Sequence, residues 1–247
     1  DALTLRAQAL DVVHAHFTHD HILARLARPK GAKLIRSMHA PRSVRWAAPQ
    51  ADGYTVPTDC LARRLLGERV LVLPALVGTQ FAPPEDRQAL RRELDLPPCK
   101  VVGMVSTFQP SRRHELGLAA FAALRAHDES TALVLVGDGP LEAELRVRAT
   151  DGVRFVGYQS GSAFVRHLQA LDEVWILGLG NDWSARAAAQ ARACGVRVLA
   201  VDEGALSRYA DALVEPTVES LLRASESNGR REATIEDTQA VARRVLA

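Results

Sequence analysis

Short, almost uninterrupted runs of apolar residues alternate along this chain with longer segments in which apolar residues recur every three or four positions. The runs are rich in Val, Leu and Ala, which is typical of strands that are buried on both faces. Strands are expected at residues 11–14, 33–38, 51–56, 70–73, 101–105, 131–136, 153–156, 173–177 and 196–201. The pattern therefore predicts an α/β protein with parallel sheets, whose strands are joined by helices in right-handed crossovers.

The longer segments predict the helices that cover these sheets. Helices are expected at residues 20–27, 59–66, 84–94, 113–126, 141–149, 161–170 and 183–194, and the pattern is helical from residue 216 onward, ending in a helix at 236–245. The stretch Phe81-Ala-Pro-Pro84 interrupts the alternation most strongly and indicates a boundary. We therefore expect a partial N-terminal domain at residues 1–82, a linker at 83–98 and a second domain at 99–247. Two Rossmann-like halves of this kind are expected to face a cleft that binds the ligand.

The composition narrows the classes of protein to which the chain can belong. The formal charge is only +2 and the basic and acidic residues are mixed, so a nucleic-acid-binding surface is not expected. No apolar run reaches the roughly 18 residues of a membrane span, and no signal peptide is recognised. Three dispersed cysteines, Cys60, Cys99 and Cys194, argue against a disulfide framework and for a reducing compartment. These features predict a cytoplasmic protein in which each cysteine is a small buried residue.

The most informative motif is Gly137-Asp-Gly-Pro140, which comes directly after the strand expected at residues 131–136. Ligands of open α/β sheets bind outside the carboxyl ends of the strands, so the backbone of this motif is a candidate to meet a ligand. Alternatively, the motif is only a tight turn into a helix, with proline at the first helical position, where its missing N–H costs nothing. A second glycine turn, Phe155-Val-Gly-Tyr158, follows the next strand and favours the ligand-facing interpretation.

Further motifs surround these two in a definite order. They are Asp11-Val-Val-His-Ala-His16, Arg36-Ser-Met-His-Ala-Pro-Arg42, Pro110-Ser-Arg-Arg-His114, Gln190-Ala-Arg-Ala-Cys-Gly195 and Ala212-Leu-Val-Glu-Pro216. In this order and spacing the motifs resemble those of the retaining glycosyltransferases of the GT-B fold, family 4, over nearly the whole chain. The resemblance implies a GT-B fold and transfer of a sugar from a nucleoside-diphosphate sugar to an acceptor. It also implies that neither a metal nor another cofactor takes part.

The resemblance assigns roles to particular residues. Thr107 and Arg112 correspond to two cations that hold the donor diphosphate in the family, so one of the two cations is absent here. Asp182 and Gln190 correspond to the family's two glutamates, and His39 to a histidine that lies near the transferred sugar. The implied site has His39 and Asp182 as catalytic residues, no metal ligand, and a donor-binding set of Thr107, Arg112, Gly137, Asp138, Gly139, Tyr158 and Gln190. The alternatives are a solvated surface arginine for Arg112, an N-cap or loop role for Asp182 and a backbone-bonded strand end for His39.

Departures from the family pattern leave a second function open. The first strands of the family's amino-terminal domain are not recognised, so the N-terminal half is expected to be incomplete, as in a fragment or a trimmed chain. The histidines at positions 14, 16, 19 and 21 lie close together, but no Cys or Glu completes a ligand set for zinc. Loss of a cation and a carboxylate from the implied site is also compatible with a catalytically degenerate GT-B-fold binding or scaffold protein. The sugar, the base, the acceptor, the oligomeric state and a peripheral membrane contact are left open.

Overall fold

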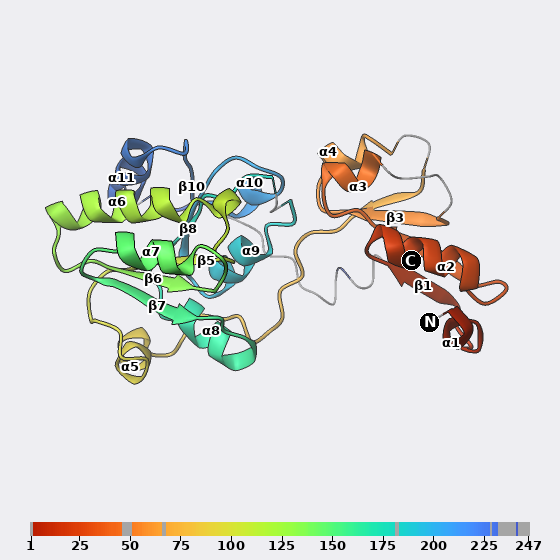
Figure 1. Cartoon of the computed structure of the whole chain (residues 1–247), viewed down its shortest axis with the longest axis horizontal. Helices are drawn as coiled ribbons and strands as arrows, with labels where there is room; N and C mark the ends of the chain where they lie inside the picture. The colour runs from red at the N-terminus through yellow and green to blue at the C-terminus, as the bar shows by residue number, and fades with distance from the viewer. Residues whose placement is uncertain are drawn as a thin grey trace. The chain divides into compact units, whose positions relative to one another are not determined.

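The structure, a computed structural model, describes residues 2–45, 51–65, 68–180, 183–227, 229–231 and 241, and it divides into two compact units. Unit 1 holds the described residues up to Ala75 together with Val241, and unit 2 holds the described residues from Leu76 to Arg231 (Figure 1). Residues 83–98, predicted as a linker, lie in unit 2 and carry a helix. The helix predicted at residues 236–245 falls outside the described residues except for Val241.

Unit 1 contains a four-stranded sheet in the order β1-β2-β3-β4, and all neighbouring strands are parallel. Its strands are β1 (Val12–Ala15), β2 (Lys33–Ser37), β3 (Gly53–Val56) and β4 (Val70–Val72). Its helices are α1 (Ala2–Arg6), α2 (Thr18–Ala27), α3 (Pro41–Arg45) and α4 (Asp59–Ala62). A small apolar core of Ala15, Ala24 and Leu34 packs α2 against the sheet. The sequence pattern missed α1 and α3 because a five-residue helix is too short to show a period.

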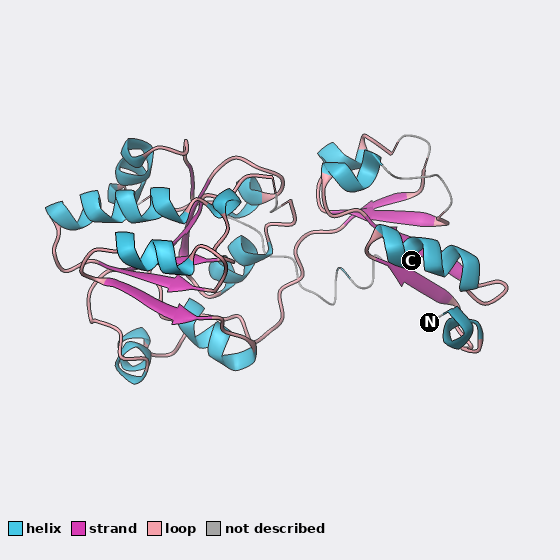
Figure 2. Ribbon diagram, in the orientation of Figure 1, coloured by secondary structure: helices cyan, strands magenta, loops and turns pink. Residues whose placement is uncertain are grey.

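Unit 2 contains a six-stranded parallel sheet with helices on both faces (Figure 2). Its strands are β5 (Val101–Val105), β6 (Ala132–Val136), β7 (Val153–Gly157), β8 (Glu173–Ile176), β9 (Arg197–Ala200) and β10 (Ala212–Leu213). Its helices are α5 (Arg87–Glu93), α6 (His114–His127), α7 (Glu142–Arg148), α8 (Gly161–Gln169), α9 (Arg186–Ala193), α10 (Leu206–Tyr209) and α11 (Val218–Glu226). The two residues of β10 were not predicted, because so short a strand leaves no apolar run.

The order of the strands in unit 2 is β10-β9-β8-β5-β6-β7. The chain first builds the sheet outward from β5 through β6 to β7, and then returns to the other side of β5 to add β8, β9 and β10. This is the doubly wound order in which the direction of building reverses between β5 and β8. The loops that leave these two strands diverge, and the carboxyl edge of the sheet at this switch point is where such folds bind ligands.

A buried ionic network fixes the opposite, amino-terminal end of β8. The Glu173 carboxylate is 2 % exposed and accepts hydrogen bonds from Arg197 at 2.6 Å, from the Trp175 indole at 2.7 Å and from the Ser225 hydroxyl at 2.6 Å. The Lys100 ammonium lies 3.8 Å from the same carboxylate and donates to Ser225 at 2.8 Å. Because the buried charge is paired and also hydrogen-bonded, this network locks α11 and β9 to β8.

The three cysteines are all free, but they do not share one environment. Cys194 is buried, Cys99 is half-buried and Cys60 is exposed on α4. Burial raises the pKa of the Cys194 thiol to about 11. The expectation that every cysteine is a buried apolar residue is therefore right for Cys194 and wrong for Cys60, because α4 buries only Leu61 and leaves its other side to solvent.

Candidate functional site

The turn after β6 packs its backbone directly against the loop that follows β5. Gly137 and Gly139 have φ values of 146° and 148°, which residues other than glycine rarely adopt. A Cβ atom on Gly139 would lie 2.7 Å from the carbonyl oxygen of Phe108, and one on Gly137 would meet the carbonyl oxygen of Ser106. The Phe108 amide donates to the carbonyl of Asp138 at 2.6 Å. The close approach of the two loops thus requires both glycines, and it leaves the Asp138 side chain exposed at the edge of the sheet.

Thr107 and Arg112 lie in the loop that leaves β5 at the switch point. Thr107 is exposed, whereas Arg112 ends a short 3-10 helix, η1 (Pro110–Arg112), and packs on Gly178 beyond β8. A Cβ atom on Gly178 would lie 3.1 Å from Cδ of Arg112. The Leu179 amide donates to the carbonyl of Ser111 at 3.2 Å. The loops from β5 and β8 therefore meet where a doubly wound fold places its ligand.

Two arginines at this position have buried nitrogen atoms that no acceptor in the described part of the chain reaches. They are Nε of Arg112 and Nη1 of Arg113. Arg113 has a left-handed backbone, with φ of 56°, and immediately precedes α6, whose amino end carries a partial positive charge. A buried donor without an acceptor costs about 1–3 kcal/mol, and cations at a helix amino end add to the positive potential. An anion such as a diphosphate fits this position because it would neutralise the charge of the two half-buried guanidinium groups and of the helix end.

His114 directly follows these two arginines and is the first residue of α6. It is 1 % exposed, its Nε2 lies 3.2 Å from the Ser106 hydroxyl, and its ring meets the edge of Phe108 at a centroid distance of 4.8 Å. Burial, reinforced by the Arg112 charge, lowers the pKa of His114 to about 4, so the imidazole is neutral at pH 7. The sequence contained His114 only as part of a motif. The burial of His114 could not be predicted from the sequence, because it depends on the contacts with Ser106 and Phe108.

The sequence interpretation missed Glu203, which lies at the same carboxyl edge of the unit 2 sheet. Its Oε1 accepts a hydrogen bond from the Gly180 amide at 2.5 Å, which joins the loops after β8 and β9. Its Oε2 is buried and has no hydrogen-bond partner within the described chain. The available signal was the acidic run Asp202-Glu-Gly204 directly after a predicted strand. Glu203 therefore places a carboxylate next to Gly180 in the loop that follows β8.

The remaining predicted donor-binding residues do not all gather at one place. Tyr158 follows β7, is 69 % exposed and lies next to Gly157, whose carbonyl accepts the Gly137 amide at 2.9 Å. Gln190 lies on α9 and lines a cavity of about 530 Å³ together with Phe81 and Phe164, but with none of the other predicted donor-binding residues. Asp182 lies outside the described residues. The structure thus brings the loops after β5, β6 and β7 together, whereas the donor-binding role of Gln190 stays a prediction.

His39 belongs to unit 1, where it is exposed just beyond β2. Its Nε2 lies 3.2 Å from Nδ1 of His16, which follows β1. Both histidines therefore stand at the carboxyl edge of the four-stranded sheet. Among the described residues, no group of three or more His, Cys, Asp or Glu side chains is arranged to hold a metal ion.

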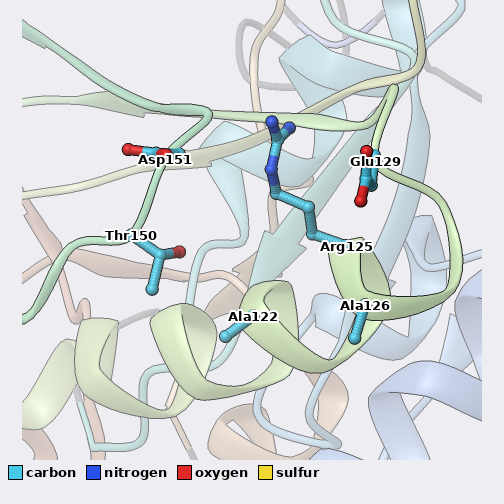
Figure 3. Close-up of a pocket in the computed structure, with 6 residues that line it drawn as sticks. All are labelled: Ala122, Arg125, Ala126, Glu129, Thr150 and Asp151. Atoms are coloured by element: carbon cyan, nitrogen blue, oxygen red, sulfur yellow. The ribbon is translucent and has the colours of Figure 1, made fainter.

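A second hollow in unit 2 lies at the wrong edge of the sheet for a donor site. Figure 3 shows this cavity of about 430 Å³, which is lined by Ala122, Arg125, Ala126, Glu129, Thr150 and Asp151. Glu129 and Asp151 precede β6 and β7, so the cavity opens at the amino ends of the strands. Its one guanidinium, that of Arg125, already donates to the carbonyl of Thr131 at 2.6 Å. The cavity therefore has no unsatisfied donor set comparable with that of the switch point.

Comparison with known families assigns unit 2 to a class of enzymes. The family described as "Glycosyl transferases group 1" matches residues 99–231, which is more than half of the chain. The chain belongs to this family of glycosyltransferases. The matched region of this glycosyltransferase contains β5 to β10 and the loops at the carboxyl edge of the unit 2 sheet. A comparison with curated proteins found no significant match. No helix of the described residues is long and apolar enough to cross a membrane.

Solved structures with the same fold confirm the predicted GT-B architecture. HepE of Anabaena, determined with UDP and glucose, is 16 % identical, with a TM-score of 0.75 over 96 % of this chain and 76 % of HepE. Sucrose-phosphate synthase of Thermosynechococcus elongatus is 19 % identical, with a TM-score of 0.69 over 87 % of this chain and 63 % of the synthase. The C-terminal domain of LpcC of Francisella tularensis is 20 % identical, with a TM-score of 0.56 over 61 % of this chain and 86 % of that domain. The parallel sheets of units 1 and 2 are thus the two Rossmann-like halves of a GT-B glycosyltransferase.

Proposed function

We propose that this glycosyltransferase transfers a sugar from a nucleoside-diphosphate sugar with retention of configuration, and that UDP is the nucleotide it takes. The observation that carries the proposal is the pair of half-buried arginines at the switch point of unit 2, Arg112 and Arg113, each with one nitrogen that has no partner in the described chain. A diphosphate supplies the acceptor oxygens and the negative charge that this position lacks. The choice of UDP is supported by HepE, a protein of the same fold whose structures were determined with UDP.

In the proposed donor complex, Arg112 and the amino end of α6 bind the diphosphate. A planar guanidinium suits phosphate because it donates two parallel hydrogen bonds. Thr107, Asp138 and the backbone of Gly137 and Gly139 would border the phosphates and the ribose. Tyr158 would border the base. The resemblance implies that Gln190 contacts the ribose. This role stays a prediction, because the cavity that Gln190 lines contains none of the other donor-binding residues.

The chemical step follows from the charge that leaves with the diphosphate. When the bond between the anomeric carbon and the diphosphate oxygen breaks, negative charge develops on that oxygen. Arg112 and the α6 amide groups stabilise it without rearranging, because they are held in place before the reaction. The acceptor hydroxyl attacks from the face that the diphosphate leaves and gives its proton to the diphosphate, so the configuration is retained. His39 is proposed to contact the transferred sugar, and the role of Asp182 stays a prediction.

Thermal unfolding in the presence of nucleotides tests the binding part of the proposal. UDP should raise the melting temperature, because a ligand that binds only the folded state stabilises it by RT ln(1 + [L]/Kd). Arg112→Ala should weaken binding by about 1.5–3 kcal/mol, the range for a hydrogen bond to a charged group. Arg148→Ala is the matched control, since Arg148 is an exposed arginine of α7 paired with Glu144 at 2.7 Å. Absence of protection by UDP and by other nucleoside diphosphates would contradict the proposal.

Release of free nucleoside diphosphate from sugar donors tests the catalytic part. Turnover that depends on Arg112 and His39 is expected. Protection by UDP without turnover of any donor would instead favour the alternative of a degenerate binding protein. We also propose a reducing, cytoplasmic location, which is supported by the three free cysteines.

A further inference from the structure

Three histidine rings form a column at the carboxyl edge of unit 1. His14 lies on β1, His16 follows β1 and His39 follows β2. The rings of His14 and His16 stack with centroids 4.5 Å apart, and those of His16 and His39 stack with centroids 5.4 Å apart. The parallel pairing of β1 with β2, which places His14 opposite Ile35, brings the three rings to the same sheet edge. His16 is therefore held between two neighbours.

The base of this column is anchored in the sheet. Nε2 of His14 lies 2.8 Å from the Ser37 hydroxyl, and that hydroxyl lies 2.6 Å from the Thr55 hydroxyl. Burial, together with the neighbouring His16 and His39, lowers the pKa of His14, so its ring is neutral at pH 7. A neutral ring fixed by the Ser37 hydroxyl, which Thr55 in turn holds, gives His16 a rigid surface to stack on.

The hydrogen bond between His16 and His39 restricts the proton positions of both rings. Nδ1 of His16 and Nε2 of His39 face each other at 3.2 Å, so one carries the hydrogen and the other must be bare. The proton on one facing nitrogen thus excludes a proton on the other. The plane of the His39 ring is set at the same time, because the rings are stacked with only 11° between their planes.

We propose that His16 is a positioning residue for His39: its Nδ1 hydrogen bond and its stacked ring set the tautomer and the orientation of the His39 imidazole. For its kinetic consequence this inference rests on the proposed contact of His39 with the transferred sugar. A histidine that donates to a sugar hydroxyl and one that accepts from it are different tautomers. His16 would therefore decide which of the two His39 presents.

Two substitutions separate the hydrogen bond from the stacking. His16→Phe keeps an aromatic ring between His14 and His39 but removes the bonding nitrogen. His16→Asn removes the ring but places an amide group where Nδ1 stands. His19→Phe is the control, because His19 lies three residues away on α2 and its side chain is 90 % exposed.

Imidazole nitrogen spectra of ¹⁵N-labelled protein read the His39 tautomer directly. We expect His16→Phe to change the nitrogen shifts of His39, and His16→Asn and His19→Phe to leave its tautomer as in the wild type. In donor turnover, His16→Phe should lower kcat about 10- to 100-fold, the effect of a misplaced contact, with little change in the KM of the donor, and His16→Asn should restore most of it. Unchanged His39 shifts in His16→Phe, or equal losses of kcat in the Phe and Asn variants, would overturn the inference. The nitrogen spectra decide it even if the wild type transfers no sugar, an outcome that would refute only the proposed function.

Discussion

Substitution of Gly139 by alanine tests the claim that two loops meet tightly at the carboxyl edge of unit 2. At this position alanine meets two obstacles. The φ value of 148° is unfavourable for any side chain, and the new Cβ would lie 2.7 and 2.8 Å from the backbone oxygen and nitrogen of Phe108. Backbone atoms cannot turn away as a flexible side chain can, so the loop after β5 must shift.

Gly157 provides a matched control, because it also has a positive φ, of 71°, but a Cβ atom added there would have no other atom within 4 Å. Gly157→Ala should therefore cost only the left-handed backbone term of about 1–2 kcal/mol. Gly139→Ala should cost at least as large a backbone term, because a φ of 148° is adopted almost only by glycine, plus about 1–3 kcal/mol for overpacking. It should also weaken UDP binding, whereas Gly157→Ala should do so less.

Urea unfolding of both variants gives the comparison, followed by tryptophan emission, to which the buried Trp175 of unit 2 contributes. The midpoint should fall further for Gly139→Ala at an unchanged slope. Equal destabilisation of the two variants would refute the reasoning, because it would show that contact with Phe108 adds nothing to the backbone term.

Three further predictions concern other parts of the molecule. Glu173→Ala should lower the free energy of unfolding by about 3–5 kcal/mol, because it leaves Arg197 buried without its carboxylate, whereas Glu144→Ala, which breaks only the exposed pair with Arg148, should cost less than about 1 kcal/mol. Denaturant titrations of both variants check this, and similar losses would contradict it. The pKa of His114 is lowered to about 4, so the unfolded state binds the extra proton and stability should fall as the pH drops from about 6.5 to about 4. His114→Gln should flatten that part of the pH profile, and an unchanged profile would exclude His114 as its source. Sugar transfer should persist in excess EDTA, since Arg112 and α6 rather than a metal are proposed to neutralise the diphosphate; loss of turnover that Mg²⁺ or Mn²⁺ restores would count against this role.

Most of the fold was readable because the strands of parallel sheets are continuous apolar runs. All nine predicted strands are present, with ends displaced by no more than two residues, as for residues 51–56 against Gly53–Val56. What failed is short. The helices α1, α3 and α10 and the strand β10 carry no periodic signal, and α4 ends at Ala62 rather than at the predicted residue 66.

The candidate site was readable only in part, because it depends on which loops meet. The glycine turn after β6 was recognised from its residues, and its contact with Phe108 explains why glycine is needed there. Gln190 was grouped with the donor-binding residues by resemblance, and this role stays a prediction, since the cavity that it lines contains none of the others. His114, Glu203 and the pairing of His16 with His39 could not be assigned, since each is defined by a partner that is distant in sequence or by burial.

Hydrogen–deuterium exchange with and without UDP tests the central claim most directly, because it reports which edge of the six-stranded sheet binds the nucleotide. The account predicts that UDP protects the amides of the loops after β5, β6 and β7, at residues 106–116, 137–141 and 157–160, together with residues 177–180 beyond β8. Arg112→Ala should reduce that protection at a fixed UDP concentration. Protection confined to the amino edge, around Glu129 and Asp151, or no protection at any UDP concentration, would contradict it.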